Sequence, residues 1–562
     1  MGIRCLVRVA VWCLVVSPAL AQQGGSGLVG YPDAPAITYH TAQIDGERIG
    51  YLALAGVQAL PDENLEPRAR IFHVAYRRVG DWTETQVVQL VSQRLGEDAA
   101  NEVRGAFSSG GPSEALPLAA RLARSAGSSV DRVIPMPPVA SRPVTFVFNG
   151  GPGSSSVWLH LGLFGPKRVT YADAFGRPGP TPNGLVDNDA SLLAETDLVF
   201  IDPVSTGYSR AEPPSAGGPF HGVEGDIESV AEFIRLWLGE HRRWASPRFL
   251  AGESYGTTRA AGLANELWSR HHIGINGVIL ISSVLNFQTL RFNDGNDLPY
   301  ALFLPTYTAV AHFHGVLPAR FQNLPLREAL REAERFALGE YALALLRGTA
   351  LPEERRRAIA ARMSELTGLS AGFVLRSNLR VTQPAFCKEL LRDQGKTVGR
   401  LDARFTGLDA DDAGDSTEYD PSYAAIRGSY TTAMNTYLRR SLGFDSDLDY
   451  RILTGAVGPW SYEGRGENRY VNTGEDLRRA MHQQPSMRVF VASGYHDLAT
   501  PYFAADYTID HLMLRPERRG NVRVGYYEAG HMMYIRRGAR RRLRDDLRAF
   551  YDGTPVGSAS ER

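Results

Sequence analysis

Residues 248–256 read R-F-L-A-G-E-S-Y-G, and the strongest indication of the architecture comes from this stretch. The apolar run R-F-L-A predicts a buried strand, and the alanine-rich sequence at residues 260–268 predicts a helix. A G-x-S-x-G motif between a strand and a helix is typical of a turn that lifts a serine hydroxyl out of the strand's end. Side chains at Gly252 or Gly256 would collide in so tight a turn. We therefore predict that Ser254 is a nucleophile, with a structural serine in an ordinary turn as the alternative.

Other short apolar runs extend the strand pattern on both sides of this motif. Each is followed by a turn and then by helix-like sequence, which is typical of buried parallel strands. The runs are V-T-F-V-F (144–148), D-L-V-F-I (197–201), G-V-I-L-I (277–281) and M-R-V-F-V (487–491). Alternating apolar and polar residues over 37–76 predict antiparallel strands before them. The predicted fold class is α/β, with a mostly parallel central sheet flanked by helices.

Two helical segments interrupt this pattern. Apolar residues at helical spacing and an alanine-rich stretch predict a mostly helical insertion at about residues 84–140. Helical sequence at 326–346 and 352–366 predicts a cap inserted into the sheet domain, because the strand pattern resumes after it. The predicted organisation is a core in two parts (37–299 and 446–552), a helical cap (300–445) and a C-terminal tail (553–562).

The first 21 residues have the features of a secretory signal peptide. Arg4 and Arg8 precede the apolar residues 9–16, and a small-residue site predicts cleavage after Ala21. This apolar run is too short to span a bilayer, and no later stretch is long and apolar enough. We expect a flexible segment at 22–36, export to the periplasm or the extracellular space, and no membrane contact after cleavage.

The composition gives no indication of a nucleic-acid partner. The chain has 61 basic and 61 acidic residues, which gives no general argument for nucleic acid or an anionic surface. Once the signal peptide is removed, Cys387 stands alone, so we expect no intramolecular disulfide and a packed thiol rather than a catalytic one. The acidic stretch 409–420 departs from EF-hand spacing and is predicted to be a solvated loop rather than a calcium site. The arginines of 536–548 are predicted to form the wet face of a terminal helix.

A nucleophilic serine needs a histidine base and an orienting acid, which in an α/β-hydrolase follow in the order Ser, Asp/Glu, His. Asp497 comes after the strand-like M-R-V-F-V-A-S-G, and His531 comes after N-V-R-V-G-Y-Y-E-A-G, so they fit the acid and the base. His496 adjoins the predicted acid and His511 falls within a predicted helix, so neither fits the base. A packed or surface histidine is the alternative for His531.

The tetrahedral oxyanion formed by serine attack needs amide donors. The N–H of Tyr255, directly after the nucleophile, is one candidate. The glycine-rich loop N-G-G-P-G-S-S-S at 149–156 follows an earlier strand, and we choose Gly151 as the second donor. A phosphate-binding loop is disfavoured because neither G-x-x-x-x-G-K-[ST] nor G-x-G-x-x-G spacing is present.

Taken in order, these motifs resemble those of the serine carboxypeptidase family. The matching segments are F-N-G-G-P-G-S-S-S (148–156), L-F-G-P (163–166), D-L-V-F-I-D-P-V-S-T-G-Y-S (197–209), G-E-S-Y-G (252–256), G-Y-H-D (494–497) and A-G-H-M-M-Y (529–534). The resemblance covers roughly residues 144–285 and 450–550. It implies an α/β-hydrolase fold with a helical cap, no metal or organic cofactor, and removal of C-terminal residues from peptides through an acyl-enzyme.

The resemblance also implies roles for individual residues. It assigns Ser254, Asp497 and His531 to a catalytic triad. It assigns the amides of Gly151 and Tyr255 to the oxyanion hole, and the side chains of Asn149 and Glu253 to the substrate's terminal carboxylate. A protonated Glu253 can donate a hydrogen bond to that carboxylate, whereas an ionised one repels it.

The chain departs from the family pattern at two positions. Ser154 stands where members often have a cysteine, in agreement with a bacterial-type, disulfide-free member. Leu163 stands where an acid usually supports the carboxylate-binding glutamate. This second change leaves the triad intact and bears on the strength and pH range of carboxylate recognition.

Two other functions stay open from the sequence. An esterase or acyltransferase would use the same triad, although Asn149 with Glu253 favours a peptidase with peptide substrates. A protein that keeps the triad but acts as a binding module is disfavoured by the intact set of Ser254, Asp497, His531 and Gly151.

Overall fold

The computed structural model describes residues 30–32, 34–171, 184–463 and 470–553. The predicted signal peptide at 1–21 lies outside the described residues, as do most of the predicted flexible segment at 22–36 and nearly all of the predicted tail at 553–562. No helix in the described ranges is long and apolar enough to cross a membrane.

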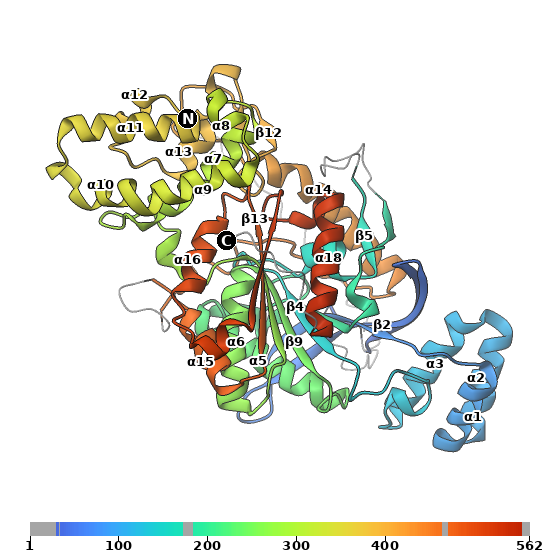
Figure 1. Cartoon of the computed structure of the whole chain (residues 1–562). Helices are drawn as coiled ribbons and strands as arrows, with labels where there is room; N and C mark the ends of the chain where they lie inside the picture. Colours follow the sequence, from blue (N-terminus) through green and yellow to red (C-terminus); the bar gives the residue numbers. More distant parts are fainter. Residues whose placement is uncertain (1–29, 33, 172–183, 464–469, 554–562) are drawn as a thin grey trace, which may run out of the picture.

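A single large sheet forms the centre of the molecule (Figure 1). Its strand order is β1-β2-β3-β7-β4-β9-β10-β13-β14. The antiparallel part consists of β1 (Ala36–Ile44), β2 (Glu47–Pro61) and β3 (Pro67–Arg78). The parallel part consists of β4 (Val144–Phe148), β7 (Asp197–Ile201), β9 (Arg248–Ser254), β10 (Gly277–Ser283), β13 (Arg488–Gly494) and β14 (Val522–Tyr527). The predicted α/β class with a mostly parallel sheet is confirmed.

Helices cover both faces of the parallel strands (Figure 1). One face packs against α5 (Val223–Glu240), α6 (Tyr255–His271) and α15 (Gly474–Gln483). The other packs against α18 (Arg537–Asp552). Coverage on both sides explains why β4, β7 and β10 are buried at every residue and read as continuous apolar runs.

Two groups of helices lie outside this core, at opposite ends of the molecule (Figure 1). The first packs its apolar residues on β1 and consists of α1 (Glu84–Leu95), α2 (Glu97–Gly110) and α3 (Pro112–Ser125). The second is the cap, which has its own apolar core and includes α7 (Leu298–Phe313), α8 (Ala319–Gln322), α9 (Leu326–Phe336), α10 (Ala342–Arg347), α11 (Glu353–Thr367), α12 (Ala371–Arg376) and α13 (Gln383–Glu389). The last helix of the predicted cap, α14 (Pro421–Thr436), instead packs its apolar residues into the core of the sheet domain. Cys387 is buried in the core of the cap as a free thiol.

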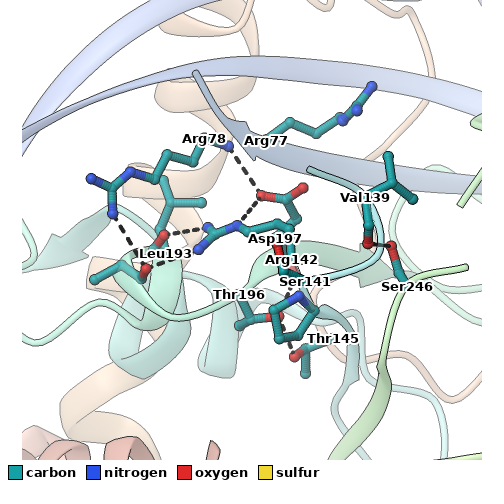
Figure 2. Close-up of polar contacts among 12 residues, drawn as sticks. Arg77, Arg78, Val139, Ser141, Arg142, Thr145, Leu193, Thr196, Asp197 and Ser246 are labelled. Atoms are coloured by element: carbon teal, nitrogen blue, oxygen red, sulfur yellow. Dashed lines mark hydrogen bonds and ion pairs between the residues drawn. The ribbon is translucent and has the colours of Figure 1, made fainter. Parts of the chain in front are cut away.

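Buried ion pairs connect segments at the N-terminal ends of the parallel strands. Asp197, the first residue of β7, accepts from the Arg142 guanidinium (3.0 Å) and the Arg78 amide (3.1 Å), as Figure 2 shows. Arg243 also pairs with Asp197. Burial alone would raise the pKa of Asp197, but the two guanidinium groups of Arg142 and Arg243 lower it to about 2. This end of the sheet is thus tied by ion pairs, and the opposite end carries Ser254.

The prediction that the arginines near the C-terminus form a wet face was wrong for two of them. Arg540 and Arg544 are buried in α18, where they pair with Asp189 (3.3 Å) and Asp45 (2.7 Å). Arg541, by contrast, is exposed as predicted. Helical spacing identifies the apolar face of such a helix but does not reveal acids that distant parts of the chain bring next to it.

The acidic stretch 409–420 is mostly exposed, with one departure from the prediction of a solvated loop. The side chain of Asp409 is fully buried and pairs with Lys388 at 2.6 Å, so this ion pair attaches the loop to α13. Within the described part of the chain, no group of three His, Cys, Asp or Glu side chains is placed to hold a metal ion.

Candidate active site

Ser254 occupies a strained turn between β9 and α6. Its backbone angles are φ 59° and ψ −130°, a conformation that non-glycine residues rarely adopt and that nucleophile elbows require. A Cβ at Gly252 would lie 2.1 Å from the carbonyl oxygen of Gly256, so a side chain at that position is excluded. The turn therefore has the geometry that the sequence motif predicts.

The glycine-rich loop lies directly against this turn. A Cβ at Gly150 would come 2.5 Å from the backbone nitrogen of Tyr255, so the loop can approach only because Gly150 has no side chain. Gly151 follows at φ 104° and lines the same cavity as Ser254. The two predicted oxyanion donors, Gly151 and Tyr255, thus belong to backbone segments in close contact, and their role stays a prediction.

A third segment holds the glycine-rich loop from the other side. The amide of Ser155 donates to the Ile452 carbonyl (3.0 Å), and the amide of Thr454 donates to the Gly153 carbonyl (3.0 Å). Ser154, at the position where a cysteine is common, accepts from the indole N–H of Trp158 at 2.8 Å. The hydroxyl thereby orients an aromatic ring that lines the cavity.

His531 and Asp497 form a buried hydrogen-bonded pair. Nδ1 of His531 lies 2.7 Å from Oδ2 of Asp497, and the two side chains are 5% and 0% exposed. The other carboxylate oxygen, Oδ1, accepts from the amides of Ala499 (2.8 Å) and Thr500 (3.0 Å), and the Thr500 hydroxyl donates to Oδ2 (2.7 Å). Asp497 is therefore fixed in orientation, and it leaves Nε2 of His531 available for another partner.

The electrostatic environment separates His531 from the histidines near it. Burial alone would lower the pKa of His531, but the carboxylate of Asp497 raises it above 6.5. His496 is also buried and has its pKa lowered to about 3, mainly by burial. His511 is exposed and follows the last residue of α16 (Tyr502–Asp510) instead of lying within that helix, which corrects its predicted position.

Glu253 and Asn149 form a second buried pair beside the nucleophile. Nδ2 of Asn149 donates to Oε1 of Glu253 at 2.9 Å, and both side chains are nearly inaccessible to solvent. Oδ1 of Asn149 accepts from the amide of Leu159 (3.0 Å), which fixes the amide group with its nitrogen toward the glutamate. Burial raises the pKa of Glu253 to about 7.

A tyrosine to which the sequence analysis gave no role lies near Glu253. Oε2 of Glu253 and the hydroxyl of Tyr534 are both buried and lack hydrogen-bond partners among the described residues. Tyr534 lowers the pKa of Glu253, and the proximity of Glu253 raises that of Tyr534. Leu163, the residue at the usual acidic position, is fully buried. A phenol therefore stands close to Glu253.

A short segment of the cap joins the two loops that carry Asp497 and His531. We call residues 400–403 the bridging segment. The amide of Leu498 donates to the carbonyl of Arg400 (3.1 Å), and the amide of His531 donates to the carbonyl of Leu401 (2.6 Å). The amide of Ala403 donates to the carbonyl of His496 (3.1 Å). The cap backbone thus helps to set the distance between the predicted acid and the predicted base.

These residues meet at a cavity of about 330 Å³. It is lined by Gly150, Gly151, Pro152, Ser154, Trp158, Glu253, Ser254, Arg400, Leu401, Asp420, Tyr423, Ile426, Leu453, His531 and Met532. Ser254, His531, Glu253 and Gly151 therefore share one cavity, while Asp497 and Asn149 contact it through His531 and Glu253. Sequence reasoning gave no role to Tyr534, although this residue ends the matching segment A-G-H-M-M-Y, and it missed Arg400, which belongs to none of the matching segments.

Comparison with known proteins relates part of the chain to a family. Residues 136–303 match the family model described as serine carboxypeptidase. Serine carboxypeptidase-like 11 of Arabidopsis thaliana is 29% identical over 136 residues, which cover 24% of this chain and 30% of that protein. Serine carboxypeptidase-like 16 of the same plant is 28% identical over 157 residues, covering 26% of this chain and 35% of that protein. The chain thus spans about a third of the length of the curated relatives it matches.

A solved structure extends the likeness in fold to most of the chain. Kex1Δp, a prohormone-processing carboxypeptidase from Saccharomyces cerevisiae, superposes with a TM-score of 0.50 at 13% identity, covering 91% of this chain and 93% of that one. The sequence match includes Asn149, Gly151 and Ser254, whereas Asp497 and His531 lie outside it and are brought to the cavity by the fold. We conclude that the chain has the α/β-hydrolase fold and is related, through residues 136–303, to the serine carboxypeptidase family.

Proposed function

We propose that the protein is a serine carboxypeptidase that removes C-terminal residues from peptides through a Ser254–His531–Asp497 triad. The observation that carries the proposal is the Asn149–Glu253 pair, buried beside Ser254 at the same cavity. An esterase needs only the nucleophile, the base and the amide donors. A protonated carboxylic acid next to an amide is suited to receive a free carboxylate, because both groups can donate hydrogen bonds.

The geometry supports a two-step reaction. Nε2 of neutral His531 takes the proton of Ser254 while the hydroxyl oxygen attacks the carbonyl carbon of the last peptide bond. The amides of Gly151 and Tyr255 stabilise the oxyanion, and Asp497 stabilises the imidazolium. His531 then protonates the departing amino acid, which leaves an acyl-enzyme. A water molecule, deprotonated by His531, hydrolyses that ester and restores the Ser254 hydroxyl.

A mixed library of peptides tests this function directly. Incubation with the mature protein should produce peptides shortened from the C-terminus, which mass spectrometry would detect as new C-termini. A fluorophosphonate probe should label the protein at Ser254. Labelling without peptide shortening would favour an esterase or acyltransferase, and the absence of both would favour a binding module.

The pH dependence of peptide hydrolysis should reveal Glu253. His531 must be neutral to act as a base, and its pKa lies above 6.5, so kcat/KM should rise with pH in that region. Glu253 must be protonated to bind a carboxylate, and its pKa is about 7, so kcat/KM should fall at higher pH. A group with this pKa is about ten parts ionised to one protonated at pH 8. We therefore expect a narrow bell whose alkaline limb approaches a decline of about tenfold per pH unit above the pKa of Glu253.

The variant Glu253→Gln separates this effect from the triad. Glutamine keeps a donor and an acceptor at the same positions but does not ionise, so the alkaline limb for free-acid peptides should flatten. The matching peptide amides have no terminal carboxylate and should show a weaker alkaline decline with the unaltered protein. Identical profiles for acid and amide peptides, unchanged in Glu253→Gln, would rule out Glu253 as the carboxylate anchor.

We also propose that the protein acts after export, in the periplasm or outside the cell. The support is the pattern of Arg4, Arg8, the apolar residues 9–16 and the small-residue site ending at Ala21. N-terminal sequencing of the protein recovered from its exporting host should begin at Gln22. An intact N-terminus at Met1 on the active protein would contradict this proposal.

A further inference from the structure

Arg400 places a cation on the wall of the catalytic cavity. It lines the cavity together with Ser254 and His531, and its side chain is exposed. Its backbone nitrogen donates to Asp420 at 3.1 Å, but its guanidinium forms no hydrogen bond or ion pair with another residue in the described part of the chain. A long side chain held by the backbone, with a free guanidinium, is available to a ligand.

The other acids at the cavity do not pair with this guanidinium. Asp420 also lines the cavity, but its carboxylate is the N-cap of α14, where Oδ1 accepts from the amides of Arg400 and Ser422 (2.9 Å). Its second oxygen, Oδ2, accepts from the amide of Leu401 at 3.2 Å. Asp497 is paired with His531, and Glu253 is bonded to Asn149. Among the described residues that line the cavity, Arg400 therefore has a charged side chain without a hydrogen-bond or ion-pair partner.

The bridging segment fixes where this charge acts. The carbonyl of Arg400 accepts from Leu498, next to Asp497, and the carbonyl of the following residue accepts from the amide of His531. Arg400 also lowers the pKa of His531, as expected for a cation near the base. Arg400 is thus held between the two triad loops and lines the cavity that also contains Ser254.

We propose that Arg400 is a specificity-determining residue that binds an acidic group of the substrate next to the scissile bond, namely the side chain of Asp or Glu in a peptide. The assignment of the scissile bond rests on the proposed function. A guanidinium can bind a carboxylate through two parallel hydrogen bonds. The rest of the wall includes the apolar side chains of Trp158, Ile426 and Met532.

The test compares matched peptides that differ in one residue. N-terminally blocked peptides would carry Glu, Gln or Lys at the last or the penultimate position, each as the free acid and as the amide. The unaltered protein should prefer Glu to Gln at one of the two positions by about 10-fold to 100-fold in kcat/KM, the effect expected of a charge-assisted hydrogen bond. Arg400→Gln should remove this preference, and Arg400→Glu should shift it toward Lys.

A control variant, and a comparison of free-acid with amide peptides, separate binding of an acidic side chain from binding of the terminal carboxylate. Arg347→Gln removes an exposed arginine at the end of α10, away from the cavity lining, and should leave the preference for Glu unchanged. In Arg400→Gln, kcat/KM should fall more for the Glu peptides than for the Gln peptides, and an unchanged melting temperature would report an intact fold. An equal loss for all free acids, with amides spared, would mean that Arg400 binds the terminal carboxylate and would overturn the proposal.

An ester series distinguishes failure of this inference from failure of the proposed function. p-Nitrophenyl butyrate and p-nitrophenyl hemisuccinate differ by an anionic acyl group. If no peptide is shortened but the esters are hydrolysed, the carboxypeptidase proposal fails. A preference for the hemisuccinate that disappears in Arg400→Gln would then still support anion binding by Arg400. Equal rates for both esters, unaffected by Arg400→Gln, would refute it.

Discussion

The change Ser254→Ala should lower kcat/KM at least a thousandfold and abolish labelling by a fluorophosphonate probe. Only the nucleophilic oxygen is removed, and losses of this order accompany removal of a triad member. The turn should survive, because alanine and serine experience the same strain at φ 59°. Steady-state hydrolysis of a C-terminal peptide, together with the melting temperature, would measure both effects.

A matched serine elsewhere on the same helix provides the control. Ser269 lies on the exposed side of α6, where its hydroxyl donates to the Asn265 carbonyl at 2.8 Å. Ser269→Ala should keep full activity and full labelling. Hydrolysis by Ser254→Ala at close to the normal rate would place the nucleophile elsewhere.

Asp497→Asn should reduce kcat about 10³-fold to 10⁴-fold at neutral pH. In the unaltered protein, Nδ1–H of His531 donates to Oδ2 of Asp497, so Nε2 is free to accept the serine proton. An amide nitrogen at that position would donate to Nδ1 and favour the tautomer with the proton on Nε2, which cannot act as a base. The acid limb should also move to lower pH, because Asp497 is what raises the pKa of His531.

The same chemical change at a distant site controls for the loss of a carboxylate. Asp98 is exposed on α2, in the helical group at the opposite end of the molecule from the cap (Figure 1). Asp98→Asn should leave kcat and the pH profile unchanged. A loss of less than tenfold in Asp497→Asn would direct attention to another acid as the partner of His531.

Local sequence predicted the features of this molecule that depend on neighbouring residues. The apolar runs identified the buried strands, because strands covered on both faces have no polar alternation. The motif around Ser254 predicted a turn that excludes side chains, and a Cβ at Gly252 would indeed collide with the backbone of Gly256. The order of the strands then indicated where an acid and a base would reach the same edge of the sheet.

Features that depend on distant pairs could not be predicted in this way. Arg540 and Arg544 are buried because Asp189 and Asp45 meet them, at sequence separations of 351 and 499 residues. Tyr534 lies near Glu253, and although it ends the segment A-G-H-M-M-Y, the sequence alone does not show that its hydroxyl meets the glutamate. Arg400 was missed for the same reason, since backbone hydrogen bonds between the cap and the triad loops depend on position rather than on side-chain type.

The bridging segment makes the cap inseparable from the chemistry. If residues 300–445 were excised, the amides of Leu498 and His531 would lose their acceptors in the cap. Each unsatisfied buried amide costs about 1–3 kcal/mol, a large part of the net stability of a typical domain. Such insertions are often regarded as modules whose sequence varies freely, while the sheet domain carries the catalytic residues. In this protein the bridging segment bonds to the loops that carry Asp497 and His531. Sequence changes in the cap that move this segment would therefore also change the distance between the two triad residues.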